Sequence, residues 1–295
     1  MPPPHDRRMA PQILDGAGVL LSRYDVIFCD VWGVLHDGFK AYESAGAALT
    51  RFRRGGGTVI LVSNAPVPRH RVLSMLDSRG VARSAFDHIV SSGELALAHL
   101  DDKGYQRVYY IGPRDRDAAF FERSTAMPAE MADAEALVCT GLNDDRTESA
   151  ATYVPILEAA LARKLPFVCA NPDLVVDVGG RLYLCAGALA DVYERMGGDV
   201  YWAGKPYPAA YESARAAAQD IRGADVPHGR ILAVGDALRT DLAGAAAAGI
   251  DAIFITGGIH RDDTMDGPLI SVPKLEKLFA DGAPPAIAAM PVLSW

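Results

Sequence analysis

Short apolar runs alternate with helical patterns along most of this chain, and no other feature constrains the fold as strongly. The clearest runs are Val26–Cys29, Thr58–Val62 and Ile231–Val234. Strands that alternate with helices are typical of a parallel sheet covered by helices. The sequence therefore predicts an α/β fold built on a parallel sheet.

The same pattern predicts the other elements. Further strands are expected at His88–Val90, Arg107–Ile111, Ala136–Thr140, Pro166–Ala170, Val200–Trp202 and Ala252–Ile255. Helices are expected at Ala41–Arg54, Arg69–Arg79, Ser92–Leu100, Asp115–Arg123, Ser149–Lys164, Ala186–Met196, Pro208–Asp220 and Asp241–Ala248. The first of these helices is expected to stop at Gly55, because glycine commonly ends helices.

Polar residues stand where several of the apolar strands end, and their order along the chain points to a single site. In chain order they are Asp30, Ser63, Asn64, Lys205, Asp236 and Asp241. Sheets of this kind hold their ligands at the carboxyl ends of their strands. If Ser63 and Lys205 serve one site, the long segment between them is an insertion large enough to be a domain. We therefore predict a core of residues 1–103 and 200–295, with an inserted α/β cap at 104–199.

These residue types suit phosphoryl transfer. A carboxylate such as Asp30 can attack phosphorus and form an aspartyl-phosphate, which water then hydrolyses. The transition states spread negative charge over three oxygens. The Ser63 hydroxyl, the Asn64 backbone N–H and the Lys205 ammonium are expected to stabilise that charge. Mg²⁺ held by carboxylates such as Asp236 would neutralise the remainder.

Each residue alone also has an ordinary structural role. An aspartate at a strand end is often a turn or helix-cap residue, and Asp241 suits the N-cap of the helix that follows it. Ser63-Asn64 fits a simple turn, and Lys205 fits a surface loop. Only the order of the residues, with three members placed directly after strands, favours the functional interpretation.

Five segments in combination resemble the haloacid dehalogenase superfamily, specifically its class IIA phosphatases with a large α/β cap. The segments are Phe28 to Gly38, Leu61 to Ala65, Ala170-Asn171-Pro172-Asp173, Gly204 to Pro208, and Gly235 to Gly249. The resemblance covers residues 24 to about 258. It implies a Rossmann-like core, Mg²⁺ dependence and phosphoester substrates.

The resemblance also implies residue roles. Asp30 would be the nucleophile, with Ser63 and Lys205 as phosphate binders. The metal would be held by Asp30, Asp236 and the backbone carbonyl of Trp32, and Asp241 would support the metal shell. Substrate contacts are expected from Trp32, Gly33, Asn64, Asn171 and Asp173, the last two on a turn that resembles the family's substrate-facing loop.

Trp32 departs from the family pattern. The phosphatases of the family carry an aspartate at this position, which protonates the leaving oxygen and later activates water. An indole N–H has no usable acidity. General acid–base catalysis contributes about 10²–10⁴-fold, so phosphatase activity on alkyl esters is in question. His36 and Asp37 are the nearest titratable replacements, although turn roles suit both equally.

A second pair of residues has a weaker claim on the site. His260-Arg261 follows the strand Ala252–Ile255 and two glycines, so this pair is a candidate for a substrate role at the same mouth. A structural role is the favoured alternative for this pair.

Charge and cysteine usage narrow the class of protein. The 295-residue chain carries a formal charge of −8, which argues against a nucleic-acid-binding face. Its four cysteines include no C-x-x-C pair, and three lie in apolar runs, as expected of core residues in a reducing compartment. No apolar stretch is long enough to span a membrane. The residues Met1 to Arg8 resemble a flexible tail rather than a signal peptide. A homodimer is one possible assembly of the chain.

We therefore expect a cytoplasmic, Mg²⁺-dependent hydrolase, a phosphatase acting on a sugar phosphate, nucleotide or similar small molecule. The alternative is a catalytically weak or inactive protein that binds a phosphate ligand on the same fold, and Trp32 favours it. A dehalogenase ranks third, because Asp236 and Asp241 suggest a metal those enzymes do not use. A Rossmann oxidoreductase ranks last, since no G-x-G-x-x-G follows the first strand.

Overall fold

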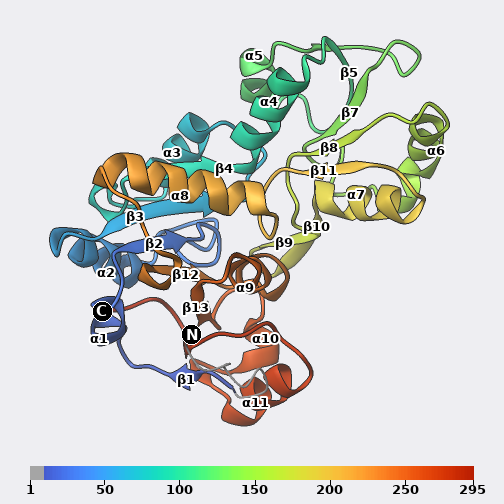
Figure 1. Ribbon diagram of the computed structural model, residues 1–295. Coiled ribbons are helices and arrows are strands. Elements are labelled where there is room, and N and C mark those ends of the chain that lie inside the picture. Colours follow the sequence, from blue (N-terminus) through green and yellow to red (C-terminus); the bar gives the residue numbers. More distant parts are fainter. Residues whose placement is uncertain (1–9) are drawn as a thin grey trace. The chain divides into compact units, whose positions relative to one another are not determined.

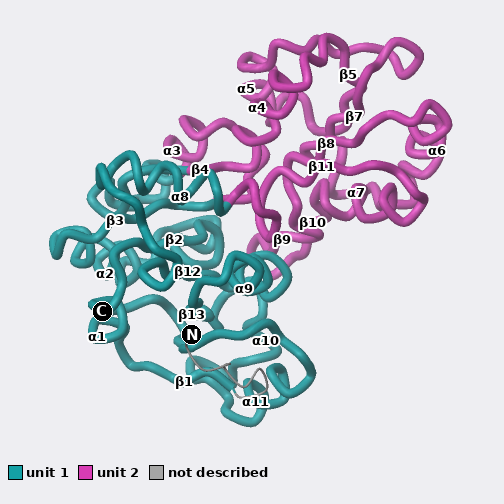
Figure 2. The backbone as a smooth tube through the Cα atoms, viewed as in Figure 1, with its two compact units in different colours: residues 1–62, 76–89, 211–295 teal, residues 63–75, 90–210 magenta. Residues whose placement is uncertain are grey.

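The computed structural model describes residues 10–295 and divides into two compact units (Figure 2). Unit 1 comprises residues 1–62, 76–89 and 211–295, and unit 2 comprises residues 63–75 and 90–210. The tail expected at the N-terminus lies outside the described residues. The predicted cap, residues 104–199, falls wholly within unit 2, which also takes in 63–75, 90–103 and 200–210.

A seven-stranded sheet in the order β1-β16-β13-β12-β2-β3-β4 forms the first layer (Figure 1). Its strands are β1 (Gln12–Ile13), β2 (Val26–Cys29), β3 (Thr58–Ser63), β4 (His88–Ser91), β12 (Ile231–Gly235), β13 (Asp251–Ile255) and β16 (Ala288–Met290). β2 pairs in parallel with both β12 and β3. All four residues of β2 are buried, so the apolar run Val26–Cys29 reflects a central strand.

Amphipathic helices cover this sheet. In α2 (Glu43–Arg54) the buried residues are Ala45, Ala48, Leu49 and Phe52, a spacing that gives one apolar face. The helix ends at Gly55, as predicted. In α8 (Pro208–Arg222) the ring of Tyr211 lies 6.4 Å from that of Phe28 on β2.

Several shorter elements accompany the seven-stranded sheet and the helices α2 and α8. They are α1 (Gly18–Leu21), α3 (Arg69–Ser78), the π-helical turn Leu238–Leu242, α9 (Ala243–Ala248), α10 (Arg261–Thr264), the ribbon β14 (Met265–Asp266) and β15 (Leu269–Ile270), and α11 (Val272–Ala280). Of these, α3 belongs mainly to unit 2. Along the chain, one boundary between the units falls at Ser63, the last residue of β3.

Unit 2 contains a five-stranded sheet in the order β11-β8-β7-β5-β6. Its strands are β5 (Arg107–Ile111), β6 (Met127–Pro128), β7 (Ala136–Cys139), β8 (Phe167–Cys169) and β11 (Val200–Trp202), all paired in parallel. Its helices are α4 (Ser92–Lys103), α5 (Ala118–Arg123), α6 (Val154–Ala162) and α7 (Ala186–Arg195), and it carries the hairpin β9 (Val175–Val178) and β10 (Arg181–Leu184). Two apolar clusters form its core: Leu157 and Tyr193 belong to one, Leu97 and Phe120 to the other.

All four cysteines are buried and none forms a disulfide. Cys29 lies in unit 1, while Cys139, Cys169 and Cys185 lie in unit 2. Burial raises the pKa of the Cys139 thiol to about 12. These side chains therefore act as small apolar core residues, as expected for Cys29, Cys139 and Cys169.

The α/β class and the parallel sheets are confirmed, with strand ends that differ by a residue or two. The helix predicted at Ser149–Lys164 starts with a 3₁₀ turn, Ala150–Tyr153, before α6. Asp241 is not an N-cap, because it lies within the π turn that leads into α9. Among residues 10–295, no helix is long and apolar enough to cross a bilayer.

Candidate active site

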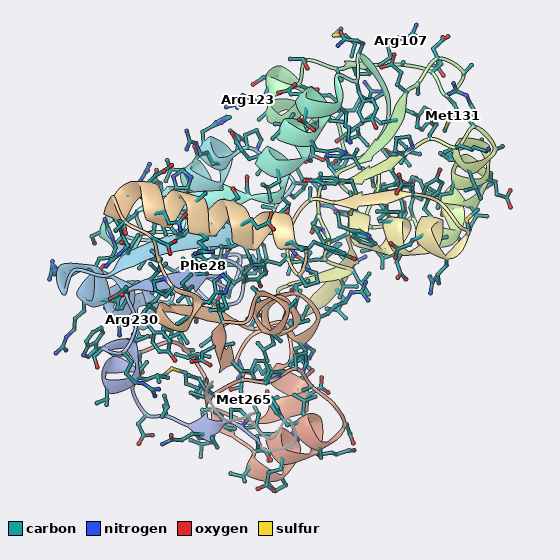
Figure 3. The ribbon with its side chains drawn as sticks, viewed as in Figure 1. Phe28, Arg107, Arg123, Met131, Arg230 and Met265 are labelled. Carbon is teal, nitrogen blue, oxygen red and sulfur yellow. The ribbon has the colours of Figure 1, made fainter. Side chains whose placement is uncertain are left out.

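The sheet of unit 1 brings two aspartates together at adjacent strand ends. Asp30 follows β2 and Asp236 follows β12, and these two strands are neighbours. The Asp30 N–H donates to the Val234 carbonyl at 2.8 Å, which extends the ladder to the strand end. Figure 3 labels Phe28 on β2, two residues before Asp30. The geometry predicted from two apolar runs is therefore present.

A third carboxylate joins them from the π turn. Ligand oxygens of Asp30, Asp236 and Asp241 all lie within 4.8 Å of one another, and all three residues are buried. Buried carboxylates this close repel each other, and a divalent cation bound by their oxygens would offset that repulsion. Clustered carboxylate oxygens are also the ligands that Mg²⁺ prefers. The residues thus fit the metal that the sequence predicts.

The Asp236 carboxylate is held in position by backbone groups. The Ile259 N–H donates to Asp236 Oδ2 at 2.8 Å. A Cβ atom on either Gly33 or Gly258 would lie 2.0 Å from the same oxygen. Only glycine allows the backbone to approach this closely, and Gly33 also has a φ of +81°. Gly33, predicted to contact substrate, thus has a defined role beside Asp236.

Asp241 and His260 fix the loop that follows β12. Asp241 Oδ2 accepts hydrogen bonds from the Asp236 and Ala237 N–H groups, both at 3.1 Å. His260 Nε2 accepts from the Leu238 N–H at 3.3 Å, and its Nδ1 faces Asp263 at 3.5 Å. His260, considered for a substrate role, therefore supports the loop that carries Asp236.

The indole of Trp32, in the loop after Asp30, packs near three other residues of unit 1. The His36 ring meets it edge-on with 5.0 Å between centroids, and the Arg79 guanidinium lies 6.0 Å above it. A Cβ on Gly38, whose φ is +93°, would lie 2.8 Å from Trp32 Cζ2. The Arg79 Nε also donates to the Gly38 carbonyl at 2.9 Å. We call His36, Gly38 and Arg79 the tryptophan seat.

The two titratable neighbours of Trp32 have structural roles. His36 is fully buried, its Nδ1 accepts from the Gly38 N–H at 2.9 Å, and its Nε2 has no partner among residues 10–295. Burial, helped by Arg79, lowers the pKa of His36 to about 4. Asp37 Oδ1 accepts from the N–H groups of Phe39 and Lys40, and the bond from Lys40 leads in lowering its pKa. Neither side chain is presented as a proton donor.

The other predicted residues gather in unit 2. Ser63 ends β3 and its Oγ accepts from the Ala65 N–H at 3.2 Å, which leaves its own hydroxyl proton to donate. Lys205 follows β11 and is 4% exposed. The side chain of Asn64 hydrogen-bonds to the Lys205 backbone and to the Asp173 carboxylate. The Asn171 Oδ1 accepts from the Asp173 N–H at 3.1 Å and so shapes the turn.

Ser92 was not predicted. Its Oγ donates to Asn64 Oδ1 at 3.2 Å, and it follows β4 directly. Ser92 fits the pattern that predicted the other site residues, because it is polar and follows a strand. The weak apolar character of His88–Val90 hid it.

Two family models match the chain. A haloacid dehalogenase-like hydrolase model covers residues 27–123, and a related hydrolase-like model covers residues 202–276. No functionally curated protein matches.

Solved structures match over nearly the whole chain. A haloacid dehalogenase-like hydrolase from Brucella suis is 40% identical, with a TM-score of 0.82 over 96% of this chain and 99% of that one. A possible sugar phosphatase from Cytophaga hutchinsonii is 21% identical (TM-score 0.73, 95% and 97% covered), and a p-nitrophenyl phosphatase from Archaeoglobus fulgidus is 19% identical (TM-score 0.68, 91% and 96% covered). The last two show the shared fold. With its carboxylate cluster and this 40% relative, the chain belongs to the haloacid dehalogenase-like hydrolases.

Proposed function

We propose that this hydrolase is a Mg²⁺-dependent phosphatase of a small organic phosphate, such as a sugar phosphate or a nucleotide. The observation that carries the proposal is the cluster of Asp30, Asp236 and Asp241 at the carboxyl ends of neighbouring strands. In this proposal Asp30 is the nucleophile and also a metal ligand, Asp236 is a second ligand, and Asp241 supports the metal shell. The phosphatases among proteins of the same fold support this choice.

In the proposed reaction, an Asp30 carboxylate oxygen attacks phosphorus and the bond to the substrate oxygen breaks. The organic group leaves with that oxygen, which takes a proton from solvent water. Water then attacks the aspartyl-phosphate, which releases inorganic phosphate and restores Asp30. Ser63, the Asn64 backbone N–H and Lys205 bind the phosphoryl oxygens. Bound Mg²⁺, held by Asp30, Asp236 and the Trp32 carbonyl, would neutralise phosphate charge.

A second candidate is a protein that binds a phosphate ligand without turning it over. Trp32 favours it, because neither the indole nor its neighbours His36 and Asp37 is presented as an acid. The two candidates differ in one observable, the formation of a covalent aspartyl-phosphate.

The test uses nitrophenyl phosphate with and without Mg²⁺. We expect Mg²⁺-dependent release of nitrophenol, a phosphorylated enzyme that can be trapped on Asp30, and loss of both in Asp30→Asn. The substitution is isosteric; it removes the attacking charge and, with it, one of the carboxylates proposed to hold the metal. Lys205→Ala should lower turnover heavily, since a positive charge near the phosphoryl group is worth several kcal/mol in a site that excludes water.

Two results would redirect the assignment. Turnover retained in a folded Asp30→Asn sample would move the chemistry to another residue. Phosphate binding without trapped phosphoenzyme would favour the second candidate. If the phosphoenzyme does form, a panel of phosphorylated metabolites assayed with Mg²⁺ would identify the substrate.

We also propose a cytoplasmic location and a small-molecule partner, with no nucleic-acid or membrane partner. The four cysteines form no disulfide, which supports a reducing compartment. The formal charge of −8 supports the absence of a nucleic-acid-binding role. Fractionation of the native cells, with the protein followed by antibody, tests the location.

A further inference from the structure

The side-chain amide of Asn64 is fully committed to partners inside unit 2. Its Nδ2 donates to Asp173 Oδ1 at 2.9 Å and to the Lys205 carbonyl at 3.1 Å. Its Oδ1 accepts from the Lys205 N–H at 2.8 Å and from Ser92 Oγ at 3.2 Å. An asparagine amide offers two donors and two acceptor positions. All four are used, so only the backbone of Asn64 remains to contact a substrate.

Two of these bonds engage the backbone of Lys205, one at its carbonyl and one at its N–H. A donor and an acceptor on one planar amide meet the carbonyl and the N–H of one residue, which fixes the direction in which the Lys205 side chain leaves the chain. The partners also settle the orientation of the amide, because its NH₂ group faces two acceptors, the Asp173 carboxylate and the Lys205 carbonyl, and its oxygen faces the Lys205 N–H donor. Asn64 is 5% exposed, so water competes little for these bonds.

Gly204 is what allows the chain to come this close. Its φ is +151°, and a Cβ there would lie 2.0 Å from Ser92 Oγ and 2.5 Å from Asn64 Oδ1. Any other residue would push Lys205 away from the amide. The glycine before the lysine is thus explained by the Asn64 contact.

The third bond reaches the turn at 171–173. Asp173 accepts from Asn64 through its carboxylate, and a hydrogen bond to a charged group is stronger than one between neutral groups. The turn is also packed against α7, because a Cβ on Gly187 would lie 2.4 Å from the Pro172 carbonyl oxygen. One side chain therefore touches both the residue predicted to bind phosphate and the turn predicted to contact the rest of the substrate.

We propose that Asn64 is a positioning residue that fixes Lys205 and links it to Asp173, so that phosphate binding and contact with the organic part of the substrate are coupled. This inference rests on the proposed phosphatase function for the roles of Lys205 and Asp173. It assigns Asn64 no contact of its own side chain with substrate.

The first test reverses the polarity of one bond. Asn64→Asp replaces the donor with an oxygen that faces the Asp173 carboxylate and the Lys205 carbonyl. We expect kcat for nitrophenyl phosphate to fall about 10–100-fold, as small displacements of catalytic groups can cost that much. Adding Asp173→Asn restores a donor between the two side chains, and kcat should recover about tenfold over Asn64→Asp alone.

Asn143→Asp is the matched control. It makes the same chemical change elsewhere in unit 2, where Asn143 Oδ1 accepts from the Gly112 N–H at 2.9 Å and an aspartate keeps that acceptor. We expect kcat unchanged in this variant. If the double variant recovers nothing, or if the control loses as much as Asn64→Asp, the proposal is wrong.

The second test needs no turnover and stands apart from the proposed function. Hydrogen exchange of the Lys205 amide, followed by NMR, should be slow in the wild type, fast in Asn64→Ala and slow in Asp173→Asn. A Lys205 amide that exchanges freely in the wild type would overturn the proposal. If the wild type forms no phosphoenzyme but shows this exchange pattern, the positioning role holds and the phosphatase assignment fails.

Discussion

Trp32 occupies a seat that other residues of unit 1 form around it. The indole contacts His36, Arg79 and the position where a Gly38 side chain would stand. Three separate positions thus accommodate a large aromatic group. The tryptophan is therefore part of the packing of this loop.

Replacing the indole with an acid tests what it does. If Trp32 only occupies the place of a general acid, Trp32→Asp should raise activity on alkyl phosphates. We expect a gain well below the lower end of about 10²-fold for a positioned acid, because the empty seat loosens the loop. Nitrophenyl phosphate, whose leaving group scarcely needs a proton, should respond much less.

Trp32→Asn is the control, since it leaves the same space without an acid. Rates for both variants on glycerol phosphate and nitrophenyl phosphate provide the measurement. Loss of activity on every substrate in both variants would mean that the indole is itself a substrate contact, such as a surface for a planar ligand.

His36 predicts a pH dependence of stability. Its pKa is lowered to about 4 in the folded protein, against 6.5 for an exposed histidine. The unfolded chain therefore binds the extra proton first, and stability is lost as pH falls from about 6.5 towards 4. The loss at pH 5 should be about 2 kcal/mol relative to pH 8.

Urea unfolding at several pH values measures this loss. His36→Gln, which cannot titrate, should show a weaker dependence over the same range. An unchanged dependence in that variant would assign the effect to other groups.

At the scale of elements, the contact between Gly38 and Trp32 predicts that two glycines of unit 1 differ in the cost of a substitution: Gly38 lies in the loop from Trp32 to Tyr42, and Gly80 follows α3. Gly38 and Gly80 have similar φ values, +93° and +82°, but only Gly38 faces an obstacle, the indole of Trp32. Gly80→Ala should cost about 1–2 kcal/mol from backbone strain alone. Gly38→Ala should cost about 1–3 kcal/mol more, from overpacking.

The free energies of unfolding of both variants give the comparison. The extra cost at Gly38 should disappear when Trp32 is also replaced by alanine, and that double variant isolates the contact. Equal costs for the two single variants would show that the loop yields without strain.

Sequence patterns found the elements that carry their own signal. Val26–Cys29 and Ile231–Val234 are buried on both faces, so they are apolar throughout and easy to identify. β1 and β16 were missed, because Gln12–Ile13 and Ala288–Met290 are short and form strands only by pairing with each other and with β13. α11 was also missed.

The site shows the same division. Asp30, Asp236 and Asp241 could be predicted to meet, since two follow adjacent strands and the third is nearby in sequence. The amide contacts of Asn64 could not, because they join residues far apart in the chain through backbone groups that any sequence contains. The tryptophan seat was hidden for a similar reason, since Arg79 reaches it from another segment.

For the whole molecule, the carboxylate cluster predicts stabilisation by metal. A cation that binds the folded state alone raises the free energy of unfolding, by about 3 kcal/mol at a hundred times its Kd. Mg²⁺ should therefore raise the melting temperature, and a chelator should reverse the rise. Asp236→Asn should abolish the response.

The control is Asp266→Asn, an exposed aspartate in the β14–β15 ribbon that pairs with Lys274. The melting temperature of the Asp266→Asn protein should still rise with Mg²⁺. A response that survives in Asp236→Asn would place the ion elsewhere.

The buried cysteines are distributed unequally between the two units, so their reactivity can report which unit unfolds first. The thiolate of a cysteine that reaches solvent attacks a disulfide reagent such as dithionitrobenzoate and releases its chromophore, and burial protects all four thiols from this reaction in the folded chain. Cys29 alone belongs to unit 1, whereas three thiols belong to unit 2. Under mild denaturant, one equivalent of released chromophore would identify opening of the first unit, and three would identify opening of the second. Rapid colour in native buffer would contradict the burial itself.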